Sequence, residues 1–113
     1  MAETALTVTT VGKAGTAKTT ANADTSNGNK FANDGKTFLY IYNNGATGTA
    51  SVNIATAATV GGYAVGDQAI SVTTTQEKIA GPFDPAVFND ADGNVTMTIT
   101  GTGAADVDLM AFK

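Results

Sequence analysis

The sequence predicts an all-β protein: a single antiparallel β-sandwich or jelly-roll-like barrel of about 7–8 strands with one short helical turn. Three observations lead to this prediction. Short runs alternate apolar and polar residues, turn-forming residues separate those runs, and no window has the three-to-four spacing of an amphipathic helix. The 113 residues are the length of one domain, so residues 1–113 are expected to fold as a single unit.

The expected core is thin. Hydrophobic residues make up 42% of the chain, but many of them are alanines, and tryptophan is absent. A chain of this length buries roughly 65% of its unfolded surface, which is enough for an independent core. Because this core is thin, part of the stability is expected to come from association with other chains.

Several segments have the pattern of β-strands. Those with one apolar and one polar face are residues 5–10, 49–55, 69–74, 94–100 and 106–112. Residues 37–43 are apolar on both faces, so this strand is expected to be central and covered on both sides. Residues 76–83 form a further strand that ends near Pro82, and residues 15–20 are a candidate edge strand.

Turn chemistry separates these segments. Residues 43–45, 34–35 and 92–93 combine Asn or Asp with Gly and can adopt the positive φ angles of tight hairpin turns. Asp84 followed by Pro85 is typical of a helix cap and first helical residue, which predicts one helical turn over residues 85–88. Residues 21–36 are polar except for Phe31, and we expect a long loop held in place by that side chain.

Composition excludes much chemistry. The chain contains no cysteine, histidine or arginine, which removes thiol nucleophiles, the commonest general base and the commonest metal ligands. The net charge of −4 argues against direct binding of nucleic acid. No apolar run has the length of a membrane span or a signal peptide, so we expect a soluble protein made without export. We expect no enzymatic activity and no cofactor.

Residues 90–94 resemble the start of a calcium loop, because Asp90, Asp92 and Asn94 alternate. A helix-loop-helix calcium site requires glycine at the sixth position and glutamate at the twelfth. Here Gly93 is fourth and Gly101 is twelfth. We interpret the segment as a turn and expect no metal, although a non-standard calcium site on a β-loop remains an alternative.

The aromatic residues of the central strand are the strongest candidates for a binding site. Phe38, Tyr40 and Tyr42 share one face of residues 37–43. Such a face is typical of a protein interface or of a platform for stacking sugars, and it can equally be covered by the rest of the domain. With tryptophan absent, a protein interface is favoured over sugar.

Three runs carry a family resemblance: NDGKTFLYIYNNG at residues 33–45, IAGPFDPAVFNDADGNVTMTITG at residues 79–101, and the closing DLMAFK. Together they resemble small all-β structural proteins of tailed bacteriophages, which are made alongside the major capsid protein and decorate or cement the head. The resemblance implies a β-module without catalytic residues that binds the outer surface of the capsid and stabilises it. It further implies the major capsid protein as partner, a homo-oligomer with a trimer favoured, and a location on the virion head after synthesis in the host cytoplasm.

Two attachment elements are expected. The first is the N-terminal segment, residues 1–10, in which Leu6 and Val8 would add as a strand to a neighbouring edge. The second combines the loop at 21–36 with residues 81–94 and would use Phe31, Phe83 and Phe88 as anchors. For every one of these residues the alternative is that it completes the core of its own domain.

Two other functions remain open. One is a component of the phage tail, neck or host-binding appendage. The other is a carbohydrate-binding module, whose site would combine Tyr40 and Tyr42 with residues 90–94.

Overall fold

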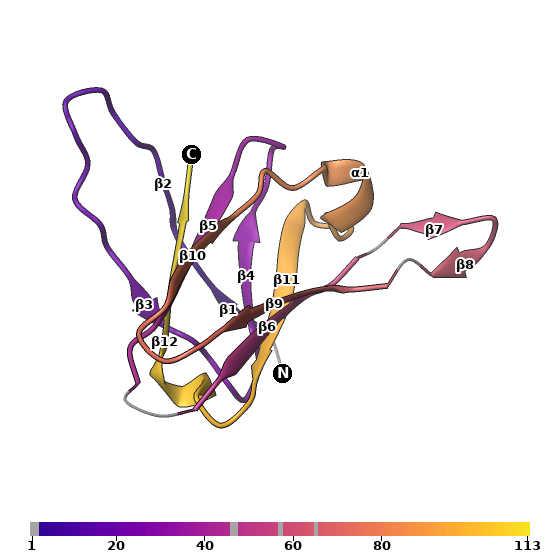
Figure 1. Ribbon diagram of the computed structural model, residues 1–113. Coiled ribbons are helices and arrows are strands. Elements are labelled where there is room, and N and C mark those ends of the chain that lie inside the picture. The colour runs from indigo at the N-terminus through magenta and orange to yellow at the C-terminus, as the bar shows by residue number, and fades with distance from the viewer. Residues whose placement is uncertain (1–2, 46–47, 57, 65) are drawn as a thin grey trace.

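The chain folds into a β-sandwich of two sheets (Figure 1), shown by a computed structural model that describes residues 3–45, 48–56, 58–64 and 66–113. The first sheet, here called the threonine sheet, contains β1 (Thr4–Ala5), β4 (Asn29–Ala32), β11 (Asn94–Thr100), β6 (Ala50–Ile54) and β9 (Gln68–Val72), in that order. The second, the aromatic sheet, contains β10 (Glu77–Ala80), β5 (Phe38–Asn43), β12 (Val107–Phe112) and β2 (Val8–Thr9), with β3 (Ala21–Asn22) also paired to β12. The predicted all-β sandwich is confirmed.

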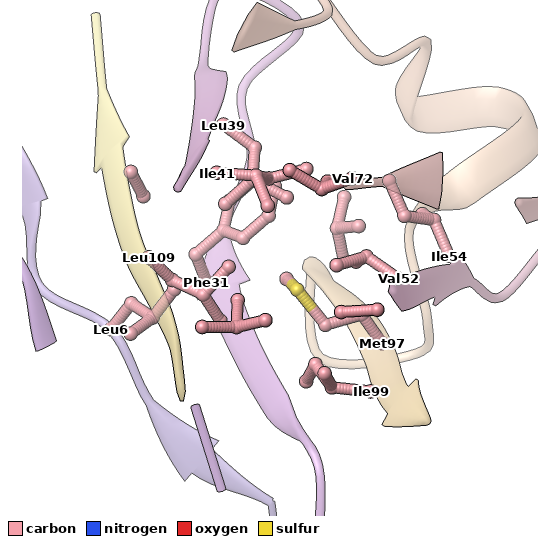
Figure 2. Packing of buried hydrophobic residues seen from close by; sticks show 14 of the residues in the cluster. Leu6, Phe31, Leu39, Ile41, Val52, Ile54, Val72, Met97, Ile99 and Leu109 are labelled. Carbon is pink, nitrogen blue, oxygen red and sulfur yellow. The ribbon is translucent and has the colours of Figure 1, made fainter. Parts of the chain in front are cut away.

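Alternating side chains from both sheets meet in one core (Figure 2). Phe31, Val52 and Met97 point inward from the threonine sheet, and Leu39, Ile41 and Leu109 point inward from the aromatic sheet. Each of these six side chains is at most 1% exposed. β5 lies between β10 and β12, so residues 37–43 form a central strand, as their apolar character on both faces predicts.

The N-terminal segment changes sheets. β1 pairs with β4 and β2 pairs with β12, in both cases in parallel, and Leu6 between them is 8% exposed. The predicted single strand over residues 5–10 is therefore two short strands that close one side of the sandwich, and the prediction of purely antiparallel pairing does not hold there. Met1 and Ala2, at the start of the predicted attachment segment, lie outside the described residues.

Residues 21–36 differ from the predicted long loop, because they contain β3 and β4. Phe31 is 1% exposed and does hold this region to the core. The polar Asn29 also points inward, where its amide accepts from the Asp24 backbone N–H and donates to the Thr4 carbonyl, so apolar alternation gave no signal for β4. The stretch without strands is instead residues 10–20, and the predicted edge strand at 15–20 does not form.

Most connections cross from one sheet to the other. β4, β6 and β11 lie in the threonine sheet, while the strands that follow them or precede them, β5, β10 and β12, lie in the aromatic sheet. The predicted hairpins at residues 34–35, 43–45 and 92–93 are therefore wrong as hairpins, although Gly35 and Gly93 do have positive φ. The predicted helical turn is confirmed as α1 (Pro85–Phe88), where the Asp84 side chain accepts from the Ala86 N–H at 2.9 Å.

A small hairpin projects from the sandwich between β6 and β9 (Figure 1). It consists of β7 (Thr59–Val60) and β8 (Tyr63–Ala64), joined by Gly61 and Gly62, which both have positive φ. We call it the arm. Its base contacts the body of the protein where the Ala58 N–H donates to the Val87 carbonyl at 3.3 Å.

Candidate interaction surface

The outer face of the aromatic sheet carries large apolar side chains. Direct pairing aligns Ile79, Tyr40 and Met110 in one row across β10, β5 and β12. In a neighbouring row Phe38 stacks on Phe112, with ring centroids 5.7 Å apart and planes inclined by 21°. We call this face the outer aromatic face. Its two apolar rows are followed by a polar row, in which Tyr42 pairs with Glu77 and Asp108.

The outer face of the threonine sheet is different in kind. Its paired rows consist of Thr, Ser, Asn, Lys and Ala residues: Thr98 beside Asn53 and Ala69, Thr100 beside Ser51 and Ser71, and Thr96 beside Lys30. Such side chains remain hydrated without a partner. The two sides of the sandwich therefore differ sharply, and only the outer aromatic face has the composition of a protein interface.

One lysine holds residues 10–20 against this face. The Lys18 ammonium donates to the Tyr40 hydroxyl at 3.2 Å and lies 4.9 Å from the centroid of the Tyr40 ring. It also lies 5.8 Å from the centroid of the Tyr42 ring and 3.9 Å from the Glu77 carboxylate. The Tyr40 hydroxyl donates in turn to Glu77. Lys18, Tyr40 and Glu77 therefore form a connected polar group at the edge of the apolar surface.

This polar group predicts a loss of stability at high pH. Burial, followed by the hydrogen bond to Glu77, raises the pKa of Tyr40 above its usual value near 10. A raised folded-state pKa means that the stabilisation is complete below about pH 10 and is lost as the pH rises through the folded-state pKa. We expect Tyr40→Phe to lower the free energy of unfolding by about 1 kcal/mol at pH 7, the net value of one hydrogen bond.

Urea unfolding of the wild type and Tyr40→Phe from neutral to strongly alkaline pH measures this effect. The difference between the two proteins should shrink as the pH rises from about 10 through the folded-state pKa of Tyr40. A difference that stays constant over the whole range would contradict the prediction, because it would show that the lost stability does not depend on the hydroxyl proton.

A shallow hollow lies between residues 10–20 and the outer aromatic face. Its volume is about 170 Å³, and it is lined by Val11, Thr16, Lys18, Tyr40, Ile79, Met110 and Phe112. Ile79 is 64% exposed and Val11 is 50% exposed, so these two apolar side chains of the lining are open to solvent, whereas Tyr40 and Met110 are buried. Exposed apolar side chains that gather on a surface mark an interaction site.

The predicted interface residues fall into two groups. Tyr40 and Tyr42 lie on the outer aromatic face, where Tyr40 is 8% exposed and Tyr42 is half-buried. The others belong to the domain's own core or pack against it: Leu6, Phe31 and Phe83 are buried, and Val8 and Phe88 are partly buried. These five residues therefore occupy the positions expected if they complete the core of their own domain.

Phe83 and Phe88 close the side of the sandwich between β9 and β10. The ring centroids of Phe83 and Phe88 are 5.3 Å apart, and those of Phe31 and Phe83 are 5.8 Å apart. Together with Ile70, Ala80 and Pro82, Phe83 and Phe88 also line a small surface groove. Little of the Phe83 side chain is available there, because it is 4% exposed, whereas Phe88 is partly buried.

Sequence reasoning missed the residues that make the hollow accessible. Ile79 lies in a segment correctly predicted as a strand, but its outward direction follows only from its pairing with Tyr40. Lys18 comes from a segment 22 residues before Tyr40, and no local pattern links the two. The arm had a signal, since two glycines between Thr59-Val60 and Tyr63-Ala64 are typical of a two-residue hairpin turn.

The segment at residues 90–94 is a turn held by its own backbone. The Asp90 carboxylate accepts from the N–H groups of Asp92 and Asn94 at 2.9 and 3.0 Å. The described part of the chain contains no cluster of acidic side chains that could hold a metal ion. The hydrogen bond from the Asn94 N–H, the largest contribution, lowers the pKa of Asp90.

A lowered pKa predicts the opposite pH dependence to that of Tyr40. The stabilisation is present above the unfolded value of about 3.9 and is lost as the pH falls through the folded-state pKa. We expect Asp90→Ala to lower the Tm at pH 7, and the difference from the wild type to vanish in strong acid. Asp92→Ala, which removes an exposed carboxylate from the same turn, is the control, and calcium is expected to leave every Tm unchanged. A calcium-dependent rise in Tm that Asp90→Ala abolishes would establish the metal site instead.

The two parts of the hypothetical sugar site lie on different sheets. Tyr40 and Tyr42 are on β5 of the aromatic sheet, and residues 90–94 lead into β11 of the threonine sheet. Tyr40 offers little ring surface for stacking, because it is 8% exposed and Lys18 lies over it. The residues of the hypothetical sugar site are therefore not brought together into one site.

Comparison with known proteins yields no relative: no protein-family model, curated protein or solved structure matches the chain. Among the described residues, no helix has the length and apolar character needed to cross a membrane.

Proposed function

We propose that this chain is a structural protein of a tailed-bacteriophage particle, which binds the outer surface of the capsid and stabilises it. The observation that carries the proposal is the outer aromatic face with its open hollow, on a domain whose opposite face is covered by small polar side chains. A domain with one partly apolar face and one polar, hydrated face has the composition expected of a protein that binds the surface of a larger assembly. The family resemblance of residues 33–45 and 79–101 supplies the identity of that assembly.

In this proposal the partners are the major capsid protein and further copies of the same chain, with a trimer as the favoured oligomer. Many copies on a repeating shell allow individually weak contacts to hold, because each bound copy raises the effective concentration of the next contact. Binding to a shell would add to the stability of the domain, because a partner that binds only the folded chain stabilises it.

Quantitative mass spectrometry of particles from the phage that encodes this chain tests the proposal. A copy number comparable with that of the major capsid protein is the expected result. A few copies per particle would assign the chain to the tail, neck or host-binding appendage, and absence from particles would overturn a virion role.

Binding to purified shells that lack the protein provides the second test. We expect Ile79→Ser to reduce the bound fraction and the protection of shells against heat, since it places a polar group in the hollow. Thr98→Ala, an exposed change on the threonine sheet, is the matched control and should bind like the wild type. Equal binding by both variants would show that the outer aromatic face plays no part.

A further inference from the structure

The exposed large hydrophobic side chains occur in two places only within the described part of the chain. Val11 and Ile79 line the hollow, and Tyr63 stands on the arm with 80% of its surface exposed. One site is concave and the other projects. This complementarity of shape raises the question of whether one fills the other.

The arm cannot reach the hollow of its own chain. Figure 1 shows the β7–β8 arm extending to the right of the sandwich, while the loop between β2 and β3, which contributes Val11, Thr16 and Lys18 to the hollow, projects on the left. The molecule measures 43 Å along its longest axis. The hydrogen bond between the Ala58 N–H and the Val87 carbonyl holds the base of the arm beside α1. Any contact between Tyr63 and the hollow must therefore join two molecules.

The hollow has the size and chemistry for one phenol ring. The hollow is open to solvent and its volume is about 170 Å³, whereas an enclosed cavity of about 150 Å³ holds a whole benzene molecule, so there is space for one ring. Ile79, Met110 and Phe112 supply an apolar wall, and methionine sulfur and aromatic rings are favourable neighbours for another ring. The Lys18 ammonium at the rim already donates to Tyr40, and its remaining N–H groups can donate to the hydroxyl of a bound ring.

We propose that the hollow of one copy receives Tyr63 from the arm of a second copy of this chain. The inference rests on the proposed function and deepens it, by naming the contact that links neighbouring copies. Because arm and hollow are different surfaces, the contact is head-to-tail, and it propagates into a closed ring or an open row. A single aromatic side chain gives a weak contact in solution, but copies held side by side on a shell would make it repeatedly.

Chemical trapping tests the contact, because the chain has no cysteine of its own. One full-length variant carries Thr59→Cys, on the arm strand that pairs with the strand of Tyr63, and another carries Thr16→Cys at the hollow. Both native side chains are exposed, and Tyr63 and Ile79 remain in place. The two purified proteins are mixed and treated with a short bismaleimide linker.

The control pair is Thr59→Cys mixed with Ala91→Cys, whose cysteine lies at an exposed position in the turn at residues 90–93. We expect the arm and hollow variants to form a covalent dimer at least about tenfold faster than this control pair, because contact raises the effective concentration of the two thiols. Adding Tyr63→Ser to the arm variant, or Ile79→Ser to the hollow variant, should remove the acceleration. Tyr63→Phe should preserve most of it.

Three results would overturn the proposal: no acceleration over the control pair, acceleration that survives Tyr63→Ser, or equally fast self-coupling of Thr59→Cys alone, which would mean that arms contact arms. The outcome is independent of the shell experiments. If the two variants are trapped but the chain is absent from particles, the contact between copies stands and the capsid role is wrong. If shell binding is normal but no trapping occurs, the capsid role stands and the hollow is assigned to a capsid protein.

Discussion

Replacing Phe31 with alanine is expected to lower the free energy of unfolding by about 3–5 kcal/mol, the usual cost of truncating a buried phenylalanine. Phe31 is 1% exposed, pairs with Val95 across β4 and β11, and packs on the ring of Phe83. Single domains are typically stable by about 5–15 kcal/mol, so one substitution would remove a large fraction of the total. Urea unfolding followed by circular dichroism measures the change.

The same experiment separates the two roles that the sequence left open for Phe31. If this side chain served mainly to anchor a partner, Phe31→Ala would leave the isolated domain nearly as stable as the wild type. Tyr63→Ala is the control, because an aromatic side chain that is 80% exposed should contribute within about 0.5 kcal/mol. A loss for Phe31→Ala no larger than that of Tyr63→Ala would contradict the placement of Phe31 in the core.

Strand positions could be predicted because alternation is a local property. Residues 94–100 were expected as a strand and form β11 with the same limits, and residues 37–43 became the central strand β5. In residues 94–100 every second side chain is apolar, and in residues 38–42 every side chain is apolar or aromatic. Turn residues stand at the ends of both segments. The same reasoning failed for β4, whose four residues are too few to show a period and whose inward face includes Asn29.

The pairing of strands could not be predicted in the same way. Residues 43–45 have the composition of a hairpin turn, yet β5 and β6 lie in different sheets. Turn residues show where the chain reverses, but they do not show whether the next strand pairs with the last one or crosses the core to the other sheet. The split of residues 5–10 between β1 and β2 has the same origin, because Leu6 fits the alternating pattern of a single strand while serving as the crossing point.

The candidate surface was only half visible in the sequence. Tyr40 and Tyr42 were recognised from their shared face, but the lining of the hollow comes from residues 11–18, β5, β10 and β12, which only the tertiary structure brings together. Ile79 lines the hollow because the register of β10 places it beside Tyr40, and Lys18 lines it because the connection between β2 and β3 folds back over Tyr40. Local patterns therefore indicate which side chains have the chemistry of an interface, and topology decides which of them reach the surface together.

Asn43 carries the second large prediction. Its side chain is fully buried, although polar, and makes three hydrogen bonds: it donates to the carbonyls of Val72 at 3.1 Å and Gly48 at 3.2 Å, and accepts from the Gly45 N–H at 3.0 Å. Val72 belongs to β9 of the threonine sheet and Asn43 to β5 of the aromatic sheet. The amide therefore ties the two sheets together at the point where the chain leaves β5.

We expect Asn43→Ala to lower the free energy of unfolding by about 2–4 kcal/mol, because it leaves buried carbonyl and N–H groups without partners. Asn43→Asp should be at least as damaging, since a carboxylate cannot donate to either carbonyl. Asn44→Ala is the matched control: the neighbouring residue is of the same type but exposed, so its loss should stay within about 0.5 kcal/mol. Equal urea midpoints for Asn43→Ala and Asn44→Ala would mean that residues 43–45 act only as a turn. A large difference would show that Asn43, although it lies in a sequence typical of a turn, is a buried link between the two sheets.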